Sequence, residues 1–309
     1  MKASHLAGLA LALVATVSAI GQAPSHQGGG SAVSADARKL QIIVPAYDTP
    51  AGAFLAALAD PVQTPEPPYG VVLNTADSGH SGWSALDRIS HRLRKRGIKT
   101  FGYVPTAFAA RPYASAVTNI DGWLAPRSVN RQATAVQYDG IFIDEMTRDC
   151  GPASGSTAWQ MYYSELYKKV HQTENMQVIG NPGTAIADCY IPAGSRGADI
   201  FVTFEGTAAD YEAAGWVGGN VWSHLHPDAG YRLGTEYTDV WFQHLVHAAP
   251  AAAGKNAFRT AFAERRASFA YVTDQALPNP WGVKATYLAD ELQWRIGTDY
   301  VDKQRTKVP

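Results

Sequence analysis

The chain has 309 residues, of which 46% are hydrophobic and 17% are charged, so it is long enough and apolar enough to bury a large core. Its 26 Lys and Arg residues nearly balance its 27 Asp and Glu residues. This balance argues against a nucleic-acid-binding protein and against a polybasic membrane-binding protein, because both classes carry a clustered positive charge.

The N-terminus has the pattern of a secretory signal peptide. A basic start precedes an apolar run from Leu6 to Val17, and the small residues Ser18 and Ala19 follow it. A run of about 12 residues is too short to cross a bilayer. We therefore predict a signal peptide over residues 1–19, a secreted protein and no membrane anchor. A buried N-terminal helix is the alternative interpretation.

Beyond the signal peptide, residues 20–39 are small, polar and rich in Gly and Ser, which is typical of a flexible leader. Apolar runs that alternate with polar loops and helical patterns follow. Eight runs have the composition of strands: 41–47, 70–74, 99–104, 140–144, 177–181, 199–205, 221–226 and 269–274. Apolar strands that alternate with helices predict a parallel sheet covered on both faces. Eight of them predict a closed (β/α)₈ TIM barrel as one domain over residues 40–305, with a doubly wound open sheet as the alternative.

One helix and one loop stand out between these strands. In the segment SALDRISHRLRKRG, Ser84 can cap a helix with Asp87 three residues later, and three apolar residues at helical spacing share one face. The basic last turn and Gly97 favour the end of this helix. Residues 248–254, AAPAAAG, are expected to form a loop.

The active site of a (β/α)₈ barrel lies at the C-terminal ends of its strands. In this chain those ends carry carboxylates, amides and aromatic rings. The candidate residues are Tyr47, Asn74, Tyr103, Asp144, Glu145, Asn181, Glu205 and Asp274, followed by Asn279 and Trp281 in the loop after the last strand. This set suits a sugar, because polar side chains can bind hydroxyl or amide groups while aromatic faces cover the apolar side of a pyranose ring. Glycoside hydrolysis also requires two carboxylates that flank one bond.

Asp144 and Glu205 are the predicted catalytic pair. Neighbouring strands lie about 4.8 Å apart, so strands four and six lie roughly 10 Å apart at the backbone. Inward-leaning side chains could close this gap to about 5 Å, the spacing of retaining glycosidases. Alternation along the strand turns Asp144 and Glu145 to opposite faces, so these neighbours should not form the catalytic couple. The acidic dipeptide could equally begin a loop and cap the next helix.

Two histidines raise a different hypothesis. His224 and His226 would share one face of a strand, with Asp228 nearby, which is a possible zinc site for a polysaccharide deacetylase. Two histidines are fewer than the usual three or four ligands, so we predict no metal and no cofactor. A serine hydrolase is disfavoured because the sequence contains no Gly-X-Ser-X-Gly motif.

The two cysteines, Cys150 and Cys189, fit an exported protein. An even pair in such a chain favours a disulfide, and two free buried thiols are the alternative. No feature of the sequence indicates a protein partner, and we expect a monomer that binds a polysaccharide substrate.

The motifs at the strand ends resemble the spherulin-4-like family, classified as glycoside hydrolase family 135. They are IIVPAY, VVLNTADSG, TFGYVPTAF with NIDGW, YDGIFIDE, IGNPG, FVTFEG and YVTDQALPNPW, in this order along the chain. The resemblance implies a (β/α)₈ fold and endo-acting cleavage of α-1,4-linked N-acetylgalactosamine in exopolysaccharide of the galactosaminogalactan type. Related families act on partly deacetylated galactosamine polymers, including the Pel polysaccharide of biofilms.

Position by position, the resemblance implies a nucleophile at Asp144, an acid/base at Glu205 and a supporting residue at Glu145. It also implies that five further side chains line the cleft, namely Tyr47, Asn74, Tyr103, Asn181 and Asn279. The chain departs from the family pattern at Asp48, where an apolar or aromatic residue is expected, and over residues 206–226.

The sequence thus predicts a secreted retaining endo-glycosidase in which Asp144 attacks the anomeric carbon. Glu205, kept protonated by a less polar setting, would donate a proton to the leaving oxygen and then activate water. The alternative is a non-catalytic glycan-binding or stress-associated wall protein on the same barrel. Carboxyl groups much more than about 10 Å apart would favour that alternative.

Overall fold

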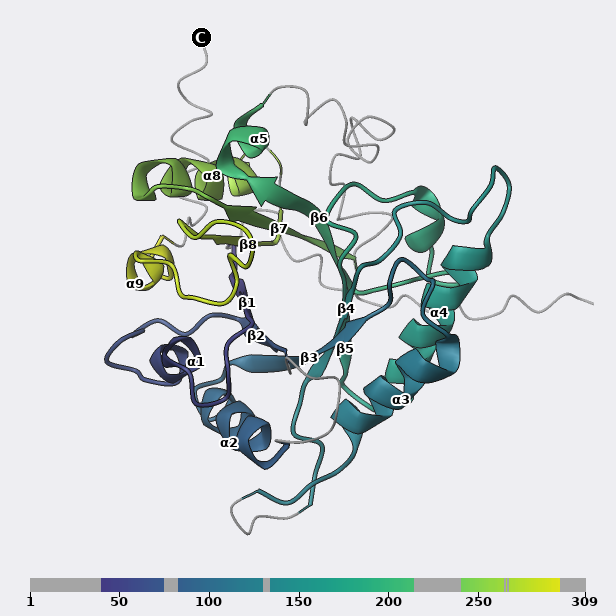
Figure 1. The fold of residues 1–309 in the computed structure, drawn as a ribbon, viewed down its shortest axis with the longest axis horizontal. Coiled ribbons are helices and arrows are strands. Elements are labelled where there is room, and N and C mark those ends of the chain that lie inside the picture. The colour runs from purple at the N-terminus through teal and green to yellow at the C-terminus, as the bar shows by residue number, and fades with distance from the viewer. Residues whose placement is uncertain are drawn as a thin grey trace, which may run out of the picture. The chain divides into compact units, whose positions relative to one another are not determined.

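The computed structural model describes residues 40–74, 83–129, 134–213, 240–263, 265 and 267–294. Within them, eight parallel strands form one sheet in which each strand pairs with the next one in the chain (Figure 1). The strands are β1 (Ile43–Ala46), β2 (Gly70–Leu73), β3 (Lys99–Pro105), β4 (Gly140–Asp144), β5 (Gln177–Gly180), β6 (Ile200–Thr207), β7 (Trp241–His247) and β8 (Phe269–Val272).

Helices follow the strands and lie on the outer side of the sheet (Figure 1). They are α1 (Ala53–Leu58), α2 (Trp83–Arg94), α3 (Tyr113–Leu124), α4 (Ala158–Val170), a short 3₁₀ helix (Asp188–Tyr190), α5 (Ala208–Glu212), α8 (Ala251–Ala263) and α9 (Leu288–Glu291). This alternation around a nearly closed sheet confirms the predicted (β/α)₈ barrel. None of the described helices is both long and apolar enough to span a membrane.

The barrel closes between β1 and β8 through an unusual seam. Backbone hydrogen bonds join the two strands only around the bridge between Gln41 and Phe269 among the residues described. One step further along a parallel ladder, the N–H of Val272 would meet the carbonyl of Ile43. Side chains pair with both of these backbone groups instead, so the barrel is completed partly by side chains.

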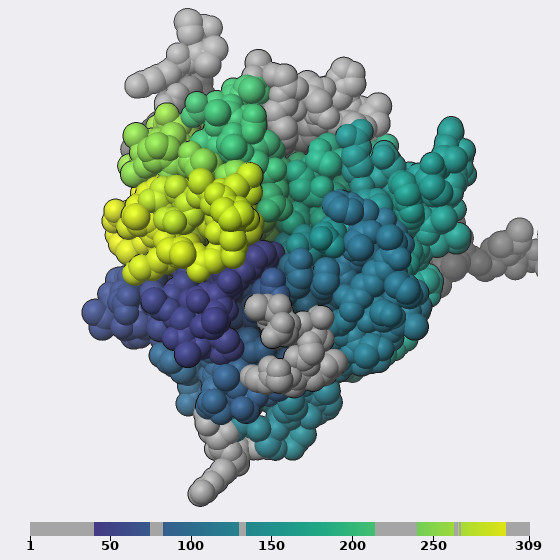
Figure 2. Space-filling view, viewed as in Figure 1, coloured from purple at the N-terminus to yellow at the C-terminus, as the bar shows by residue number. Residues whose placement is uncertain are grey.

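Two buried side chains form hydrogen bonds with the unpaired backbone groups of this seam. The N–H of Val272 donates to Glu291 Oε1 (2.7 Å), and Gln243 Nε2 donates to the carbonyl of Ile43 (3.0 Å). Both Glu291 and Gln243 are fully buried. Burial raises the pKa of Glu291 well above its ordinary value, which favours the neutral carboxyl. The first and last described segments, purple and yellow, lie side by side at this seam (Figure 2).

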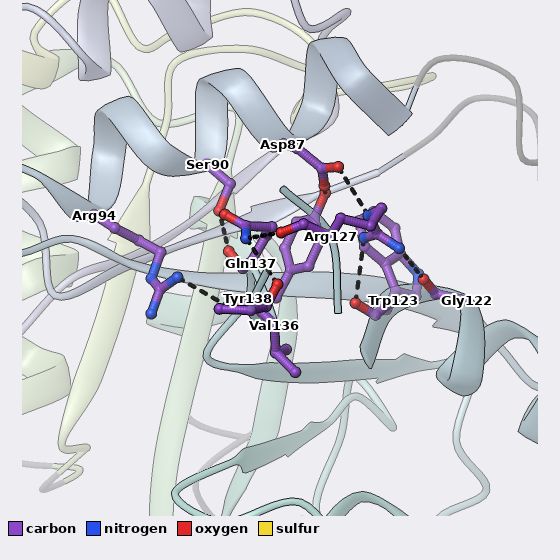
Figure 3. Close-up of polar contacts among 10 residues, drawn as sticks. Asp87, Ser90, Arg94, Gly122, Trp123, Arg127, Val136, Gln137 and Tyr138 are labelled. Carbon is purple, nitrogen blue, oxygen red and sulfur yellow. Dashed lines mark hydrogen bonds and ion pairs between the residues drawn. The ribbon is translucent and has the colours of Figure 1, made fainter. Parts of the chain in front are cut away.

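A buried ion pair fixes the connection between α3 and β4 (Figure 3). Asp87 of α2 is 3% exposed and accepts hydrogen bonds from Arg127 Nε (2.8 Å) and from the hydroxyl of Tyr138 (2.9 Å). Arg127 also donates to the carbonyl of Gly122 (2.7 Å), and its guanidinium lies 4.2 Å from the ring centroid of Trp83. Buried ion pairs of this kind contribute geometry more than stability, and this one sets where β4 begins.

The sequence predicted the face of α2 correctly but not its start. Leu86, Ile89 and Leu93 are buried, and Gly97 ends the helix with a φ of +76°, as predicted. The predicted cap at Ser84 is wrong, because α2 already includes Trp83 and Ser84 lies inside its first turn.

Two other predictions about the C-terminal half are wrong. The seventh strand of the sheet is Trp241–His247 rather than 221–226, a segment that lies outside the described residues. Gln243 and His247 interrupt the apolar pattern of this strand, because one closes the seam and the other points to the barrel mouth. The predicted loop at 248–254 is also wrong from Ala251 onward, where α8 begins after Pro250. Alanine is the strongest helix former, and proline is well tolerated at a helix start.

Candidate active site

Two carboxylates meet at the C-terminal ends of β4 and β6. Asp144 is the last residue of β4, and Glu205 lies near the end of β6. A single amide nitrogen, Asn181 Nδ2, donates to Asp144 Oδ1 (2.7 Å) and to Glu205 Oε2 (2.8 Å). Because both bonds share this nitrogen, the two carboxylate oxygens lie within about 5.5 Å of each other, the spacing of a retaining glycosidase.

Each carboxylate also accepts a hydrogen bond from an aromatic side chain. The hydroxyl of Tyr103, on β3, donates to Asp144 Oδ2 (2.6 Å). The indole of Trp281, in the loop after β8, donates through Nε1 to Glu205 Oε1 (2.9 Å). All four oxygens of the pair therefore have a donor. This polar setting differs from the less polar one that the sequence hypothesis assigned to Glu205.

Burial and charge both act on Asp144. The pKa of Asp144 is raised from 3.8 to about 6; burial is the largest cause, and the nearby charge of Glu205 acts in the same direction. The hydrogen bonds from Tyr103 and Asn181 act in the opposite direction, because they stabilise the ionised carboxylate.

The position of Asn181 is fixed by its own backbone and by Gly183. Its N–H donates to the carbonyl of Ile143 in β4 (2.8 Å), and its Oδ1 accepts from the N–H of Gly183 (2.9 Å). The carbonyl of Gly183 in turn accepts from the N–H of Glu205 (2.9 Å). Gly183 has a φ of +65°, which explains why glycine suits this position. The motif NPG thus links β4, β5 and β6 at one point.

Glu145 turns away from Asp144, as the strand alternation predicts. Its carboxylate accepts a hydrogen bond from the N–H of Ala107 (2.9 Å), and its carbonyl accepts one from the N–H of Phe108 (2.8 Å). Its φ of +53° lies in the left-handed region, which is uncommon for a residue other than glycine. Glu145 therefore organises the turn after β3 and does not contribute a second carboxylate to the pair.

Tyr47, at the end of β1, completes the aromatic surroundings. Its ring lies 5.3 Å from that of Tyr103, edge to face. Burial raises the pKa of Tyr47 far above 10, and the charges of Asp144 and Glu205 add to this effect. Asp48 accepts a hydrogen bond from a backbone N–H in the first turn of α1 (2.9 Å), which accounts for its departure from the family pattern.

The other predicted site residues lie at strand ends without contacting the pair. Asp274 accepts a hydrogen bond from the N–H of Thr286 (3.1 Å) and fixes the loop after β8. Asn279 is exposed, and its Oδ1 accepts from the N–H of Trp281 (3.3 Å), so it orients the residue that contacts Glu205. Asn74 follows β2 and is partly exposed.

Sequence reasoning missed His247 at the end of β7. This residue is 6% exposed, pairs with Thr207 of β6 in the sheet register, and lies with its ring 6.0 Å from that of Trp281. Burial lowers its pKa, which favours the neutral imidazole. The signal in the sequence was the run WFQHLVH, whose last residue falls at a strand end once the run is assigned to β7.

A chain of buried hydroxyl groups supports the loop after β4. Thr106 donates to the carbonyl of Asp144 (2.8 Å) and lies 3.0 Å from the hydroxyl of Tyr163. The same tyrosine accepts from the N–H of Thr147 (3.1 Å), whose hydroxyl lies 2.8 Å from that of Tyr190. This series of hydroxyl groups ends next to a disulfide.

That disulfide joins Cys150 to Cys189, with 6.1 Å between their Cα atoms. Cys150 lies in the loop after β4, and Cys189 lies in the 3₁₀ helix after β5. The cross-link therefore ties together the two loops that follow Asp144 and Asn181.

Among the residues that the structure describes, no group of three or more His, Cys, Asp or Glu side chains is arranged to hold a metal ion. His224 and His226, the alternative metal ligands, lie outside the described residues.

The fold and the site define a (β/α)₈ barrel protein with a two-carboxylate centre at the C-terminal ends of its strands. The profile of Spherulation-specific family 4 (Spherulin4) matches residues 41–293. The chain belongs to this family, which confirms the resemblance seen in the sequence motifs. None of the curated proteins matches the chain.

One solved structure shares this fold, and two others are more distantly similar. The crystal structure of Aspergillus clavatus Sph3 in complex with GalNAc is 20% identical, covers 83% of this chain and 97% of its own, and has a TM-score of 0.60. The glycoside hydrolase domain of PelA from Pseudomonas aeruginosa is 15% identical, with 75% and 93% covered and a TM-score of 0.39. The GH99 endo-α-mannosidase from Bacteroides thetaiotaomicron is 13% identical, with 77% and 76% covered and a TM-score of 0.42.

Proposed function

We propose that the protein is a secreted, retaining endo-glycosidase that cleaves α-1,4-linked N-acetylgalactosamine or galactosamine in an exopolysaccharide. The observation that carries this proposal is the single amide of Asn181 between Asp144 and Glu205, which keeps their oxygens within about 5.5 Å. An inverting enzyme needs room for a water molecule between its carboxyl groups, and this separation is too short for one.

In the proposed reaction, Asp144 attacks the anomeric carbon while Glu205 protonates the leaving oxygen. Glu205 then removes a proton from the water molecule that hydrolyses the glycosyl-enzyme. The pair must hold one proton to begin. The reaction needs this proton on Glu205 and an ionised Asp144, and the hydroxyl of Tyr103 stabilises the ionised form of Asp144.

The substrate class rests on family membership and on the aromatic surroundings of the pair. Tyr47, Tyr103 and Trp281 bring ring surfaces to the carboxylates, which suits a pyranose. The family resemblance points to α-1,4-linked galactosamine polymers, and Sph3, which shares the fold, is known in complex with GalNAc. Secretion is proposed from the signal-peptide pattern of residues 1–19.

The test is incubation of the purified protein with purified galactosaminogalactan and with Pel, followed by mass spectrometry of the released oligosaccharides. We expect oligosaccharides of several sizes from at least one polymer, α-anomers as first products by NMR, and none from the Asp144→Asn variant. First products that are β-anomers would overturn the retaining mechanism, and the absence of any cleavage would overturn the glycosidase function. Activity should survive EDTA, whereas loss in EDTA would favour a metal site at His224 and His226.

The second candidate, a non-catalytic glycan-binding wall protein, would need the aromatic surroundings but not a close carboxylate pair. The short distance between Asp144 and Glu205 favours hydrolysis over this alternative. Binding without cleavage in the same incubation would reverse that preference.

A further inference from the structure

A turn with an unfavourable backbone presents an exposed aromatic ring at the end of the barrel that carries the carboxylate pair. Ala107, Phe108 and Ala109 follow β3, and their φ angles are +49°, +54° and +64°. The left-handed region is unfavourable for any residue with a Cβ atom, and it is usually occupied by single residues. Three consecutive residues in this conformation require support from the rest of the structure.

Glu145 provides that support. Its carboxylate accepts the N–H of Ala107 and its carbonyl accepts the N–H of Phe108, at 2.9 and 2.8 Å. The turn closes with a third bond, from the N–H of Arg111 to the carbonyl of Thr106 (3.0 Å). The residue that follows Asp144 in the chain therefore holds Phe108 in place. Backbone conformations of this kind persist mainly at functional sites.

Phe108 is not part of the core. Its side chain is 60% exposed, and two large apolar side chains in the first turns of the next two helices are also exposed, Tyr113 in α3 (42%) and Met161 in α4 (55%). The ring of Tyr162 lies 6.1 Å from that of Tyr113 and joins the two helices. We call these four residues, Phe108, Tyr113, Met161 and Tyr162, the rim patch.

The rim patch lies at the same end of the barrel as the carboxylate pair. Phe108 comes three residues after the end of β3, and the helices α3 and α4 lie side by side with their first turns at this end (Figure 1). Exposed apolar surface at the end of a barrel that carries the catalytic site is typical of a ligand-binding surface. An exposed ring on an unfavourable turn adds nothing to the core, so stability does not explain it.

We propose that the rim patch, with Phe108 at its centre, is a subsite that stacks on hexosamine units of the polysaccharide beyond the two units at the cleaved bond. This proposal rests on the proposed function and extends it. The face of an aromatic ring fits the apolar face of a pyranose, and it also attracts the ammonium group of a deacetylated unit. Contacts with remote units help an endo-acting enzyme to hold a long chain across its active site.

The test compares Phe108→Ala with the wild type on two substrates, a long polymer and the shortest oligosaccharide that is cleaved. We expect KM for the polymer to rise about fivefold, as the loss of one stacking contact predicts, with kcat and the short-substrate kinetics unchanged. Phe108→Trp should retain the wild-type KM. Val62→Ala is the matched control, because Val62 is 84% exposed but lies in the loop before β2, at the opposite end of the barrel.

A binding experiment separates this proposal from the proposed function. Polysaccharide affinity electrophoresis with the Asp144→Asn variant measures retardation without any cleavage. In that background, Phe108→Ala should weaken the affinity derived from the retardation about fivefold. If retardation depends on Phe108 but the wild type cleaves nothing, the subsite proposal stands and the proposed glycosidase function is overturned. Cleavage with an unchanged KM in Phe108→Ala would overturn the subsite and keep the glycosidase.

A leucine variant tests the chemistry of the contact. Phe108→Leu keeps an apolar side chain but removes the ring face, so we expect it to behave like Phe108→Ala. Wild-type kinetics in Phe108→Leu, together with a loss in Phe108→Ala, would show a general apolar contact and overturn sugar stacking. Thermal unfolding of each variant confirms that the barrel is folded, because Ala and Leu tolerate this φ no worse than Phe.

Discussion

The replacement of Asp144 by Asn should raise stability at neutral pH while it abolishes hydrolysis. The folded-state pKa of Asp144 is about 6 and its ordinary value is 3.8, so the folded protein binds this proton more tightly than the unfolded chain does. The free energy of unfolding therefore falls as the pH rises from about 4 to about 6, and it stays lower above that range. An uncharged side chain at this position avoids this loss in the free energy of unfolding.

The size of the effect follows from the shift in pKa. A shift of roughly two units corresponds to about 3 kcal/mol at most. Asn keeps an acceptor for Asn181, and its amide can donate to the hydroxyl of Tyr103, but it loses the stronger bonds that a charged carboxylate accepts. We expect a net gain of about 2 kcal/mol at pH 8, which raises Tm by about 5 °C for a domain of this size.

Thermal unfolding of the wild type and of Asp144→Asn at pH 4 and pH 8 measures this gain. The difference between the two proteins should be large at pH 8 and close to zero at pH 4, where Asp144 is protonated. Asp121→Asn serves as the control, because Asp121 forms an exposed ion pair with Lys169 whose loss should have little effect at either pH. An equal difference at both pH values, or a less stable variant at pH 8, would refute the argument.

Three further predictions concern the surroundings of the pair. Tyr103→Phe removes a hydrogen bond that lowers the pKa of Asp144, so the acidic limb of the kcat/KM profile should move to higher pH, since the nucleophile must be ionised. An unmoved limb between pH 4 and 8 would contradict this role. Trp281→Phe removes the donor to Glu205 and should lower kcat about tenfold or more with little change in KM, and an unchanged kcat would argue against it. Replacing both Cys150 and Cys189 by Ser should lower the free energy of unfolding by about 4 kcal/mol in urea, because the cross-link spans 39 residues. A loss below about 1 kcal/mol would show that the disulfide constrains the unfolded chain little.

The two catalytic carboxylates could be predicted from the sequence, because both lie at the ends of predicted strands. The runs GIFID and FVTFE each end in a carboxylate, and alternation alone turns Asp144 inward and Glu145 outward. The shared amide of Asn181 was not predictable in this detail. The sequence places Asn181 at the end of β5, but the bridge to both acids depends on the left-handed Gly183 and on three strand registers acting together.

The seventh strand shows where pattern analysis fails for a physical reason. Gln243 is fully buried because it donates to the carbonyl of Ile43, and His247 is buried beside Trp281. Polar residues with such roles look like loop residues in a sequence, since their partners are distant in the sequence, about 200 residues away for Gln243. The exposed Phe108 is the opposite case, an apolar residue that does not belong to the core.

The seam between β1 and β8 constrains the order in which the chain can fold during synthesis. Until Glu291 has left the ribosome, the N–H of Val272 lacks its acceptor, so the seam between β1 and β8 is incomplete. A nascent chain that ends before α9 would leave the edges of β1 and β8 incompletely paired, and such edges favour association with other chains. The barrel is therefore completed only when almost the whole described sequence is available.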